Sequence, residues 1–166
     1  MDKQLLEKLY DAYYQEIYLY VYALCKNHEW AADLTQETFL KALLSLDQSH
    51  TNMRAWLYTV ARNLYYNEVS KNRRVMYVDE YENEAEDRAN IPLENILSKE
   101  RNRLWYHAIE HLPERQREIV MMQYFGGLGQ KEIAKVLHMT PENVRVSAHR
   151  AKKQMKNYME GQGYEL

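Results

Sequence analysis

The fold of this chain is decided by one stretch near its C-terminus, Gly129-Gln-Lys-Glu-Ile-Ala-Lys-Val-Leu-His-Met-Thr-Pro-Glu-Asn-Val-Arg-Val-Ser-Ala-His-Arg-Ala-Lys-Lys153. In its first half, Ala134 and Leu137 share one helical face, and the small alanine lets a second helix cross closely. The second half opens with Thr140, a good N-cap, and Pro141, which suits the first position of a helix. These features predict a helix-turn-helix.

The predicted turn contains one unusual residue. Four residues after Ala134 the backbone of such turns usually goes left-handed, where glycine is preferred, and this chain has His138 there. Histidine tolerates a positive φ better than most residues. We therefore expect a strained but intact turn.

The second helix of the motif combines a buried stripe with a basic face. Val144, Ala148 and Ala151 recur at helical spacing and are expected to pack inward. The basic residues left facing outward are Arg145, His149, Arg150, Lys152, Lys153 and Lys156. A basic helix beyond a tight turn is typical of proteins that read the major groove, although a solvated surface can have the same composition.

The composition predicts a helical protein. Its 166 residues include only 3 Pro and 5 Gly, so long periodic segments run with little interruption, and the chain suits one compact domain or two small ones. The formal net charge is −2, whereas a free-standing nucleic-acid binder is usually basic. The charge is segregated, however, because acidic residues crowd the middle and basic ones follow Arg62 and fill the last helix.

The cysteine content and the hydropathy of the chain indicate the cellular compartment of the protein. Cys25 is the one cysteine and lies in an apolar context, so we expect a buried small hydrophobe, with a redox sensor as the alternative. No apolar run approaches the roughly 20 residues that span a bilayer, and the N-terminus has no signal-peptide pattern. These features predict a cytoplasmic protein without membrane insertion.

The first part of the chain predicts three helices, over about residues 3–26, 29–46 and 53–71. Thr51 or Asn52 is expected to cap the third of them. Six tyrosines lie in the first helix. They either form a stacking platform for bases or, as is commoner, pack their rings and leave their hydroxyls in water.

Residues 75–92 change in character. They are strongly acidic and contain few apolar side chains, so they cannot bury enough surface to fold alone and read as a flexible linker. Helices resume over about residues 93–111, and Leu112-Pro113 starts another that ends at Gly126-Gly127. The sequence therefore predicts an all-α protein of two small helical domains joined by an acidic linker, with the helix-turn-helix in the second.

Three segments carry a resemblance to a known family. They are Ala32-Asp-Leu-Thr-Gln-Glu-Thr-Phe-Leu-Lys-Ala42, Ala55-Trp-Leu-Tyr-Thr-Val-Ala-Arg-Asn63, and Leu112-Pro-Glu-Arg-Gln-Arg-Glu118 with the helix-turn-helix after it. In this order, across an acidic linker, they resemble the polymerase-binding segment, the promoter-melting helix and the −35 reader of the extracytoplasmic-function (ECF) sigma factors of bacterial RNA polymerase, in the sigma-70 superfamily. The resemblance covers nearly the whole chain.

The resemblance implies a function and a set of partners. Residues 1–74 would be sigma region 2, which binds core polymerase and recognises and melts the −10 element; residues 75–92 would be the linker; and residues 93–166 would be sigma region 4, which recognises the −35 element. The protein is expected to direct polymerase to specific promoters in a stress or envelope response. Its partners would be the β′ clamp helices and β flap of core polymerase, promoter DNA and an anti-sigma factor, with no cofactor, metal or enzymatic activity.

The family's functional positions fall on three groups of residues in this sequence. The polymerase-binding group is Asp33, Gln36, Glu37 and Leu40. The −10 group is Asp47, His50, Asn52, Asn63, Tyr66, Asn67, Arg73 and Arg74. The −35 group is Arg145, Val146, His149, Arg150 and Lys153. Their chemistry suits these roles, because amides and aromatic rings can hold an unstacked base, Arg can read guanine, and Lys can contact phosphates.

The chain departs from the family's pattern at two positions. Ser147 stands where a further Arg is common, which puts one phosphate contact in doubt. Gly129 stands where a Ser or Thr often caps the first helix of the motif. Glycine is a tolerable N-cap, so the second change costs only a few tenths of a kcal/mol.

Two other functions fit parts of the sequence. The string His107-Ala-Ile-Glu110-His111 places two histidines on one helical face, as in inverted zinc-protease motifs, and Glu114 or Glu118 could add a ligand. It lies on a helix without any sign of a substrate cleft, so this is a minor alternative. The other is a stand-alone helix-turn-helix regulator. Co-purification with core polymerase separates that regulator from a sigma factor.

Overall fold

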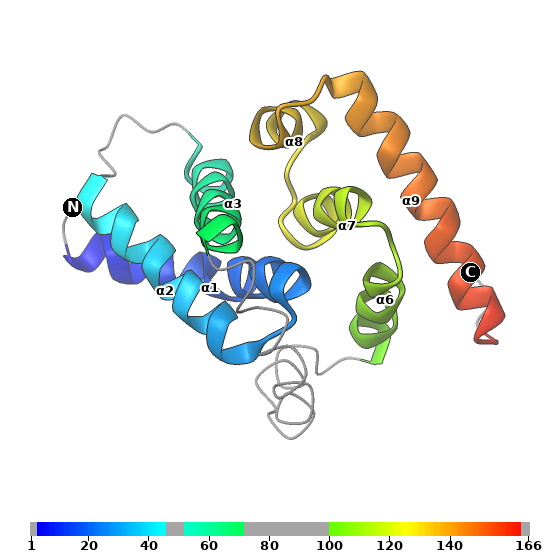
Figure 1. Ribbon diagram of the computed structural model, residues 1–166, viewed down its shortest axis with the longest axis horizontal. Coiled ribbons are helices and arrows are strands. Elements are labelled where there is room, and N and C mark those ends of the chain that lie inside the picture. Colours follow the sequence, from blue (N-terminus) through cyan, green and yellow to red (C-terminus); the bar gives the residue numbers. More distant parts are fainter. Residues whose placement is uncertain (1–2, 46–51, 72–99, 164–166) are drawn as a thin grey trace. The chain divides into compact units, whose positions relative to one another are not determined.

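The structure is a computed structural model that describes residues 3–45, 52–71 and 100–163 (Figure 1). Within these residues every regular element is a helix. The chain divides into two compact units, Met1–Ile91 and Pro92–Leu166, and each is considered by itself. The prediction of an all-α protein with two small helical domains is confirmed, while the linker predicted over 75–92 lies outside the described residues.

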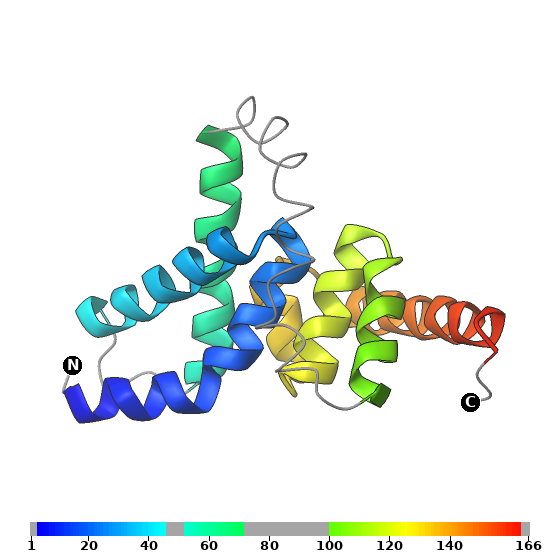
Figure 2. The ribbon, with the colours of Figure 1, turned by 90° about the horizontal axis from the view of Figure 1, so that it is seen from below.

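The described part of unit 1 consists of three helices, α1 (Lys3–Cys25), α2 (His28–Ser45) and α3 (Met53–Lys71). Each helix packs on the other two, with α3 crossing both α1 and α2 (Figures 1 and 2). The helices meet around a core of large side chains that includes Ile17, Tyr20, Leu34, Leu57 and Tyr58. Burial of apolar surface of this kind is the main force that holds small helical units together.

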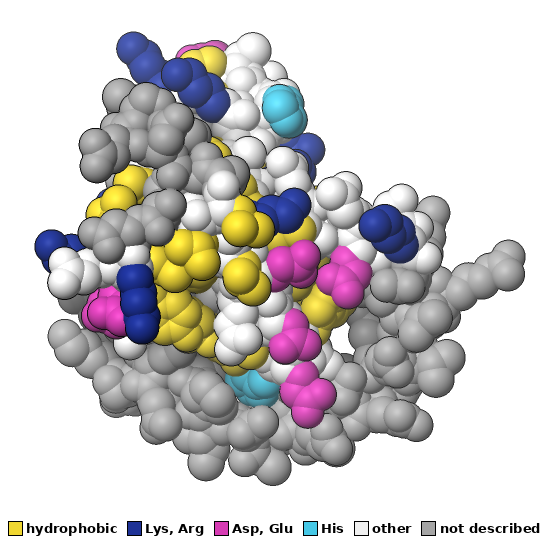
Figure 3. Space-filling model, turned by 90° about the vertical axis from the view of Figure 1, so that its left-hand side faces the viewer, with side chains coloured by type: hydrophobic (Ala, Val, Ile, Leu, Met, Phe, Trp, Pro, Cys, Tyr) yellow, Lys and Arg dark blue, Asp and Glu magenta, His cyan; other side chains and the backbone are white. Residues whose placement is uncertain are grey.

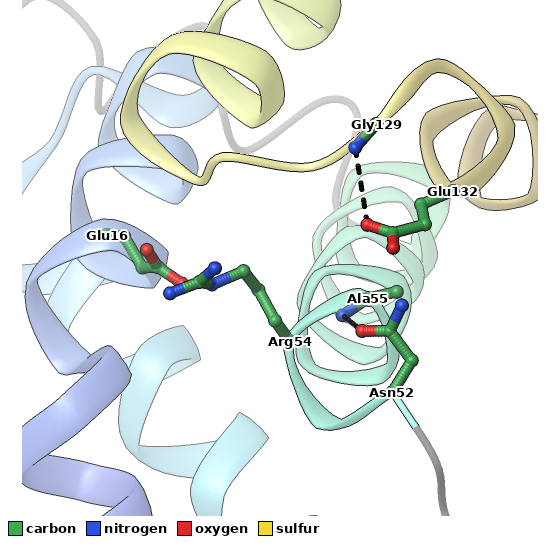
Figure 4. Close-up of polar contacts among 6 residues, drawn as sticks. All are labelled: Glu16, Asn52, Arg54, Ala55, Gly129 and Glu132. Atoms are coloured by element: carbon green, nitrogen blue, oxygen red, sulfur yellow. Dashed lines mark hydrogen bonds and ion pairs between the residues drawn. The ribbon is translucent and has the colours of Figure 1, made fainter.

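Asparagine side chains cap the N-termini of two of these helices. The Asn27 Oδ1 accepts a hydrogen bond of 2.8 Å from the Trp30 amide at the start of α2. The Asn52 Oδ1 accepts one of 3.1 Å from the Ala55 amide at the start of α3 (Figure 4). Each satisfies an amide that the first helical turn leaves without a partner. Asn52 is thus the cap that the sequence allowed, whereas Thr51 lies outside the described residues.

The tyrosines of α1 build the core of unit 1. Tyr18 and Tyr20 are 3% and 0% exposed, and the Tyr20 ring meets the Tyr58 ring edge-on at 5.1 Å between centroids. The Tyr18 hydroxyl pairs with Nδ1 of the buried His28. The prediction that the rings pack is confirmed. The expectation that their hydroxyls reach water is wrong for Tyr18 and Tyr20, because these side chains point inward and the packed helices cover them.

Cys25 ends α1 as a free, buried thiol. Its Sγ lies 3.4 Å from the carbonyl oxygen of Asn27, in the turn that joins α1 to α2. The prediction of a buried small hydrophobe is confirmed.

The described part of unit 2 contains α6 (Glu100–Glu110), α7 (Glu114–Val120), the π-helical turn η1 (Met121–Phe125), α8 (Gln130–Leu137) and α9 (Pro141–Gly161). The long α9 packs against α6, α7 and α8 (Figure 1). Large buried side chains of this core include Tyr106, Ile109, Ile119, Met121, Met122 and Ile133. None of the helices in the described residues is long and apolar enough to cross a membrane.

One helix of unit 2 differs from the prediction. The sequence predicts a regular helix from Leu112-Pro113 to Gly126, but α7 widens into η1, where the Gly126 amide bonds the Met121 carbonyl five residues back at 3.1 Å. The wider turn places Met121 and Met122 together in the core, both 0% exposed. A π-turn has the composition of an α-helix, so periodicity alone did not show it.

Candidate polymerase and nucleic-acid interfaces

The helix-turn-helix of unit 2 has the predicted backbone. His138 ends α8 in the left-handed region, at φ 55° and ψ 47°, and the Met139 amide bonds the Ala134 carbonyl at 2.9 Å. The Thr140 hydroxyl then accepts a 3.1 Å hydrogen bond from the Asn143 amide and caps α9. Both the strained histidine turn and the threonine cap are therefore confirmed.

Gly129 precedes the first helix of this motif, α8, and provides only part of its N-terminal cap. Its backbone is extended, at φ −79° and ψ 168°, and its amide donates to the Glu132 carboxylate at 3.3 Å (Figure 4). Glycine has no side chain to return the contact, so only half of a capping box is present. A Cβ at this position would have no heavy atom within 4 Å, so a serine would fit.

The basic face of α9 is exposed. Val144, Ala148 and Ala151 are buried on the opposite face, as the spacing predicts. Of the residues predicted to contact the −35 element, Val146 is half-buried, and those that are exposed are Arg145, His149, Arg150 and Lys153. A long helix with one anchored face and one exposed basic face can lie in a major groove and contact bases and phosphates.

Arg145 has a partner within its own helix. Its Nε donates to Oε2 of Glu142 at 3.1 Å and its Nη2 donates to Oε1 at 2.5 Å. These hydrogen bonds hold the pKa of the Glu142 carboxyl below its usual range, and they raise the pKa of the Arg145 guanidinium. Glu142 was not among the predicted site residues, although its i,i+3 spacing from an arginine indicates such a pair.

The predicted polymerase-binding residues share one exposed face of α2. Asp33, Gln36, Glu37 and Leu40 are all exposed. On the buried side the Thr35 and Thr38 hydroxyls bond the carbonyls of the preceding helical turn at 2.6 and 2.7 Å, which allows two polar residues to face the core. The acidic residues therefore lie outside the packing of unit 1.

Leucines accompany these acidic residues on α2. Leu40 is 54% exposed, and Leu44, one turn further along, is 81% exposed. Leu40 was predicted as a contact residue and Leu44 was not, although their spacing of four residues puts both on one helical face. Figure 3 shows acidic side chains gathered beside hydrophobic ones on one face of the molecule.

The outer face of α3 carries amides and an aromatic ring. Asn63 and Asn67 are exposed and Tyr66 is half-buried, with the Arg62 guanidinium 4.6 Å from the centre of its ring. Asn52 uses its side-chain oxygen to cap the helix, so that oxygen is already occupied. The other predicted −10 residues, which lie outside the described residues, are Asp47, His50, Arg73 and Arg74.

Comparison with known families assigns both units. Residues 9–75 match the model "Sigma-70 region 2", and residues 102–155 match "Sigma-70, region 4". The chain belongs to the ECF sigma factors of the sigma-70 family. The order of the two regions is the order predicted from the sequence.

Relatives and solved structures agree with this assignment. The sigma factor is 28% identical to the RNA polymerase sigma factor YlaC of Bacillus subtilis (strain 168), over 93% of this chain and 91% of the relative. It is 23% identical to the ECF sigma factor SigM of the same organism, over 91% and 93% of the two chains. The sigma factor RpoE of Bartonella quintana, solved with the anti-sigma factor NepR, shares the fold with a TM-score of 0.69 at 20% identity, over 96% of this chain and 98% of that one.

The histidine motif of this sigma factor is engaged in other contacts. The His111 ring stacks on Tyr158 at 4.3 Å, and its Nδ1 lies 2.8 Å from the His107 carbonyl. Glu118, a conceivable third ligand, is 1% exposed in the core. Across the residues that the structure describes, no group of three His, Cys, Asp or Glu side chains could hold a metal ion.

Proposed function

We propose a division of roles between the two units of this ECF sigma factor. As a member of its family, the chain directs RNA polymerase to specific promoters and so initiates transcription. Unit 1 binds core polymerase and the melted −10 element, and unit 2 binds the −35 element. The chain contributes recognition and no chemical step, and it acts in the cytoplasm, in a stress or envelope response.

The observation that carries the proposal is the exposed basic face of α9. It follows directly on the capped turn at Thr140, so its first residues lie at the end of the helix that enters a groove in proteins of this kind. Arg145, Val146, His149 and Arg150 face base edges or the adjacent backbone, and Lys153 contacts a phosphate. Arginine and lysine differ here because only arginine offers a planar fork that matches guanine.

The exposed face of α2 is the proposed polymerase contact. Asp33, Gln36 and Glu37 present carboxylates and an amide beside Leu40, on a helix anchored by its other side. Such a face suits the β′ clamp helices of core polymerase, with leucine giving apolar contact and the acidic residues giving orientation. Unit 2 makes the second contact, with the β flap.

The outer face of α3 is the proposed −10 surface. Asn63 and Asn67 can bond the edge of an unpaired base, and Tyr66 offers a ring for stacking. Arg62, which lies over that ring in the free protein, is suited to a nearby phosphate. The proposal includes an anti-sigma factor as a further partner, supported by the sigma factor RpoE of Bartonella quintana, which shares this fold and was solved with the anti-sigma factor NepR.

The proposal is tested by binding of holoenzyme to a library of −35 sequences at several salt concentrations. Arg145→Ala is expected to lose about five- to 150-fold in affinity for the preferred sequence and to relax preference at one or two positions. Lys153→Ala is expected to weaken all sequences alike and to reduce the salt slope by about one unit. The same uniform loss in both variants would show that α9 is not placed as proposed.

A further inference from the structure

The contact between Glu142 and Arg145 has a specific geometry. The carboxylate accepts from Nε and Nη2, which is the side edge of the guanidinium, at 3.1 and 2.5 Å. A guanidinium has five N–H donors, so three remain. Two of them form the end edge, Nη1–H and Nη2–H, which is the edge that can bond the O6 and N7 atoms of guanine. Glu142 therefore holds Arg145 without occupying its base-reading edge.

The pair lies where a reading arginine is useful. Glu142 and Arg145 are the second and fifth residues of α9, in the part of a recognition helix that meets base edges. Both side chains are exposed, 67% and 56%, so the carboxylate is not needed to fill or neutralise the core. An acidic group on a DNA-facing surface opposes binding to phosphates, so its presence needs a compensating role, in stabilising the N-terminus of α9 or in recognition.

We propose that Glu142 is a positioning residue, which orients the Arg145 guanidinium for a guanine in the −35 element and thereby sets base discrimination at that position. The inference rests on the proposed placement of α9. A long side chain loses rotamer freedom when it binds, and a residue that fixes the rotamer beforehand lowers that loss. This positioning strengthens binding to the matched base alone, because a phosphate contact does not require one orientation of the guanidinium.

Two substitutions separate positioning from other roles of Glu142. Glu142→Gln keeps the shape and removes the negative charge. Glu142→Asp keeps a negative charge at the N-terminus of α9, where it favours the helix, but is one methylene too short to hold the guanidinium side-on. Both changes are at an exposed position and are expected to leave folding intact.

The experiment measures binding of holoenzyme to a library of −35 sequences for wild type, both Glu142 variants, Arg145→Ala and the double variant Glu142→Gln/Arg145→Ala. We expect both Glu142 variants to lower discrimination at the base that Arg145→Ala identifies, by about two- to fivefold, the range of an exposed ion pair. Glu142→Gln is also expected to bind non-specific DNA more tightly, whereas Glu142→Asp is not. In the Arg145→Ala background, Glu142→Gln is expected to change discrimination no further, because coupled residues are not additive.

Three results would overturn the inference. If Glu142→Gln changes affinity for every sequence equally, Glu142 acts only through its charge. If it alters preference at another base, or still does so without Arg145, Glu142 reads DNA directly. If Arg145→Ala itself has no base-selective effect, the placement of α9 is wrong and the inference fails with it. The Arg145→Ala variant therefore distinguishes an error in the proposed function from an error confined to Glu142.

Discussion

At the scale of single residues, two buried tyrosines of unit 1 differ in one hydrogen bond. The Tyr58 hydroxyl is fully buried and has no hydrogen-bond partner among the described residues, whereas the Tyr65 hydroxyl donates to the Leu24 carbonyl at 3.1 Å. We expect Tyr58→Phe to leave the free energy of unfolding unchanged or to raise it by about 1 kcal/mol, because it removes an unsatisfied polar group. Tyr65→Phe is the matched control and is expected to lower the free energy of unfolding by about 0.5–1.5 kcal/mol.

The measurement for this pair is chemical denaturation of the full chain, with amide exchange in α1–α3 used to assign the change to unit 1. An equal loss of stability in the two variants would contradict the assignment of Tyr58 as unsatisfied.

Glu16 gives a prediction that depends on pH. Burial raises the pKa of its carboxyl, and Arg54, whose Nε lies 2.9 Å from Oε1, lowers it by less (Figure 4). The folded protein then holds this proton more tightly than the unfolded chain, so the contribution of Glu16 to stability falls as pH rises through the ordinary carboxyl range, about 4 to 5, and above it.

We therefore expect Glu16→Gln to melt at a higher temperature than wild type at pH 7 and to lose that advantage below about pH 4. Thermal unfolding of both proteins across this pH range is the measurement. A wild type that is the more stable protein at pH 7 would mean that the pair with Arg54 outweighs the burial of the carboxylate.

At the scale of elements, the turn between α8 and α9 contains removable strain. His138 adopts φ 55°, a region in which glycine has no steric penalty. His138→Gly is expected to raise the free energy of unfolding of unit 2 by about 0.5–1 kcal/mol, since the left-handed conformation costs an ordinary residue about 1–2 kcal/mol. Lys135→Gly, inside α8, is the control and is expected to lower the free energy of unfolding by about 1 kcal/mol. Destabilisation by both substitutions would show that the His138 side chain contributes more than the backbone costs.

The exposed face of α2 is tested by charge reversal. Asp33→Lys/Glu37→Lys is expected to abolish assembly with core polymerase while leaving the helical content unchanged, because exposed substitutions change stability by less than about 0.5 kcal/mol. The matched control is Glu7→Lys/Asp11→Lys, which makes the same change of charge at the same spacing on the exposed side of α1. The readout is co-purification with core polymerase, and normal assembly of the Asp33/Glu37 variant would refute the assignment of α2.

How far the sequence predicts these elements depends on the range of the interactions involved. The helix-turn-helix was predictable because Thr140, Pro141 and the apolar spacing of α9 act within a few residues. The π-turn at Met121–Phe125 was not, because a π-turn has the composition of an α-helix and differs only in the hydrogen bond from the Gly126 amide to the Met121 carbonyl. The buried Tyr18 hydroxyl likewise depends on His28 across a turn. For the candidate site, the exposure of the α2 and α9 residues followed from their helical faces, and the i,i+3 spacing of Glu142 and Arg145 indicates that they pair. Spacing does not determine which edge of the guanidinium the carboxylate holds, and that edge proves to be Nε and Nη2.

At the scale of the whole molecule, the distribution of charge matters more than its sum. The chain is acidic overall, at −2, yet α9 presents a basic face. A net negative protein gains little from non-specific attraction to DNA, so promoter contact by the free chain is expected to be weak. Binding through both units on one polymerase would make the second contact intramolecular and raise its effective concentration. We therefore expect the free chain to occupy few promoters in the absence of polymerase.

The two proposed roles of unit 1, docking and melting, are separable in the assembled holoenzyme. Asn63 is exposed on α3 and is proposed to bond the edge of an unpaired base. We expect Asn63→Ala to leave assembly with core polymerase and contact with the −35 element intact and to reduce open-complex formation, since the lost hydrogen bond exists only after the strands separate. Asn157→Ala, at an exposed asparagine of α9, is the control and is expected to melt DNA normally. The measurement is the permanganate reactivity of the melted thymines. Reactivity equal to wild type in Asn63→Ala would show that Asn63 does not belong to the −10 surface. Loss of assembly would instead place Asn63 in the contact with polymerase.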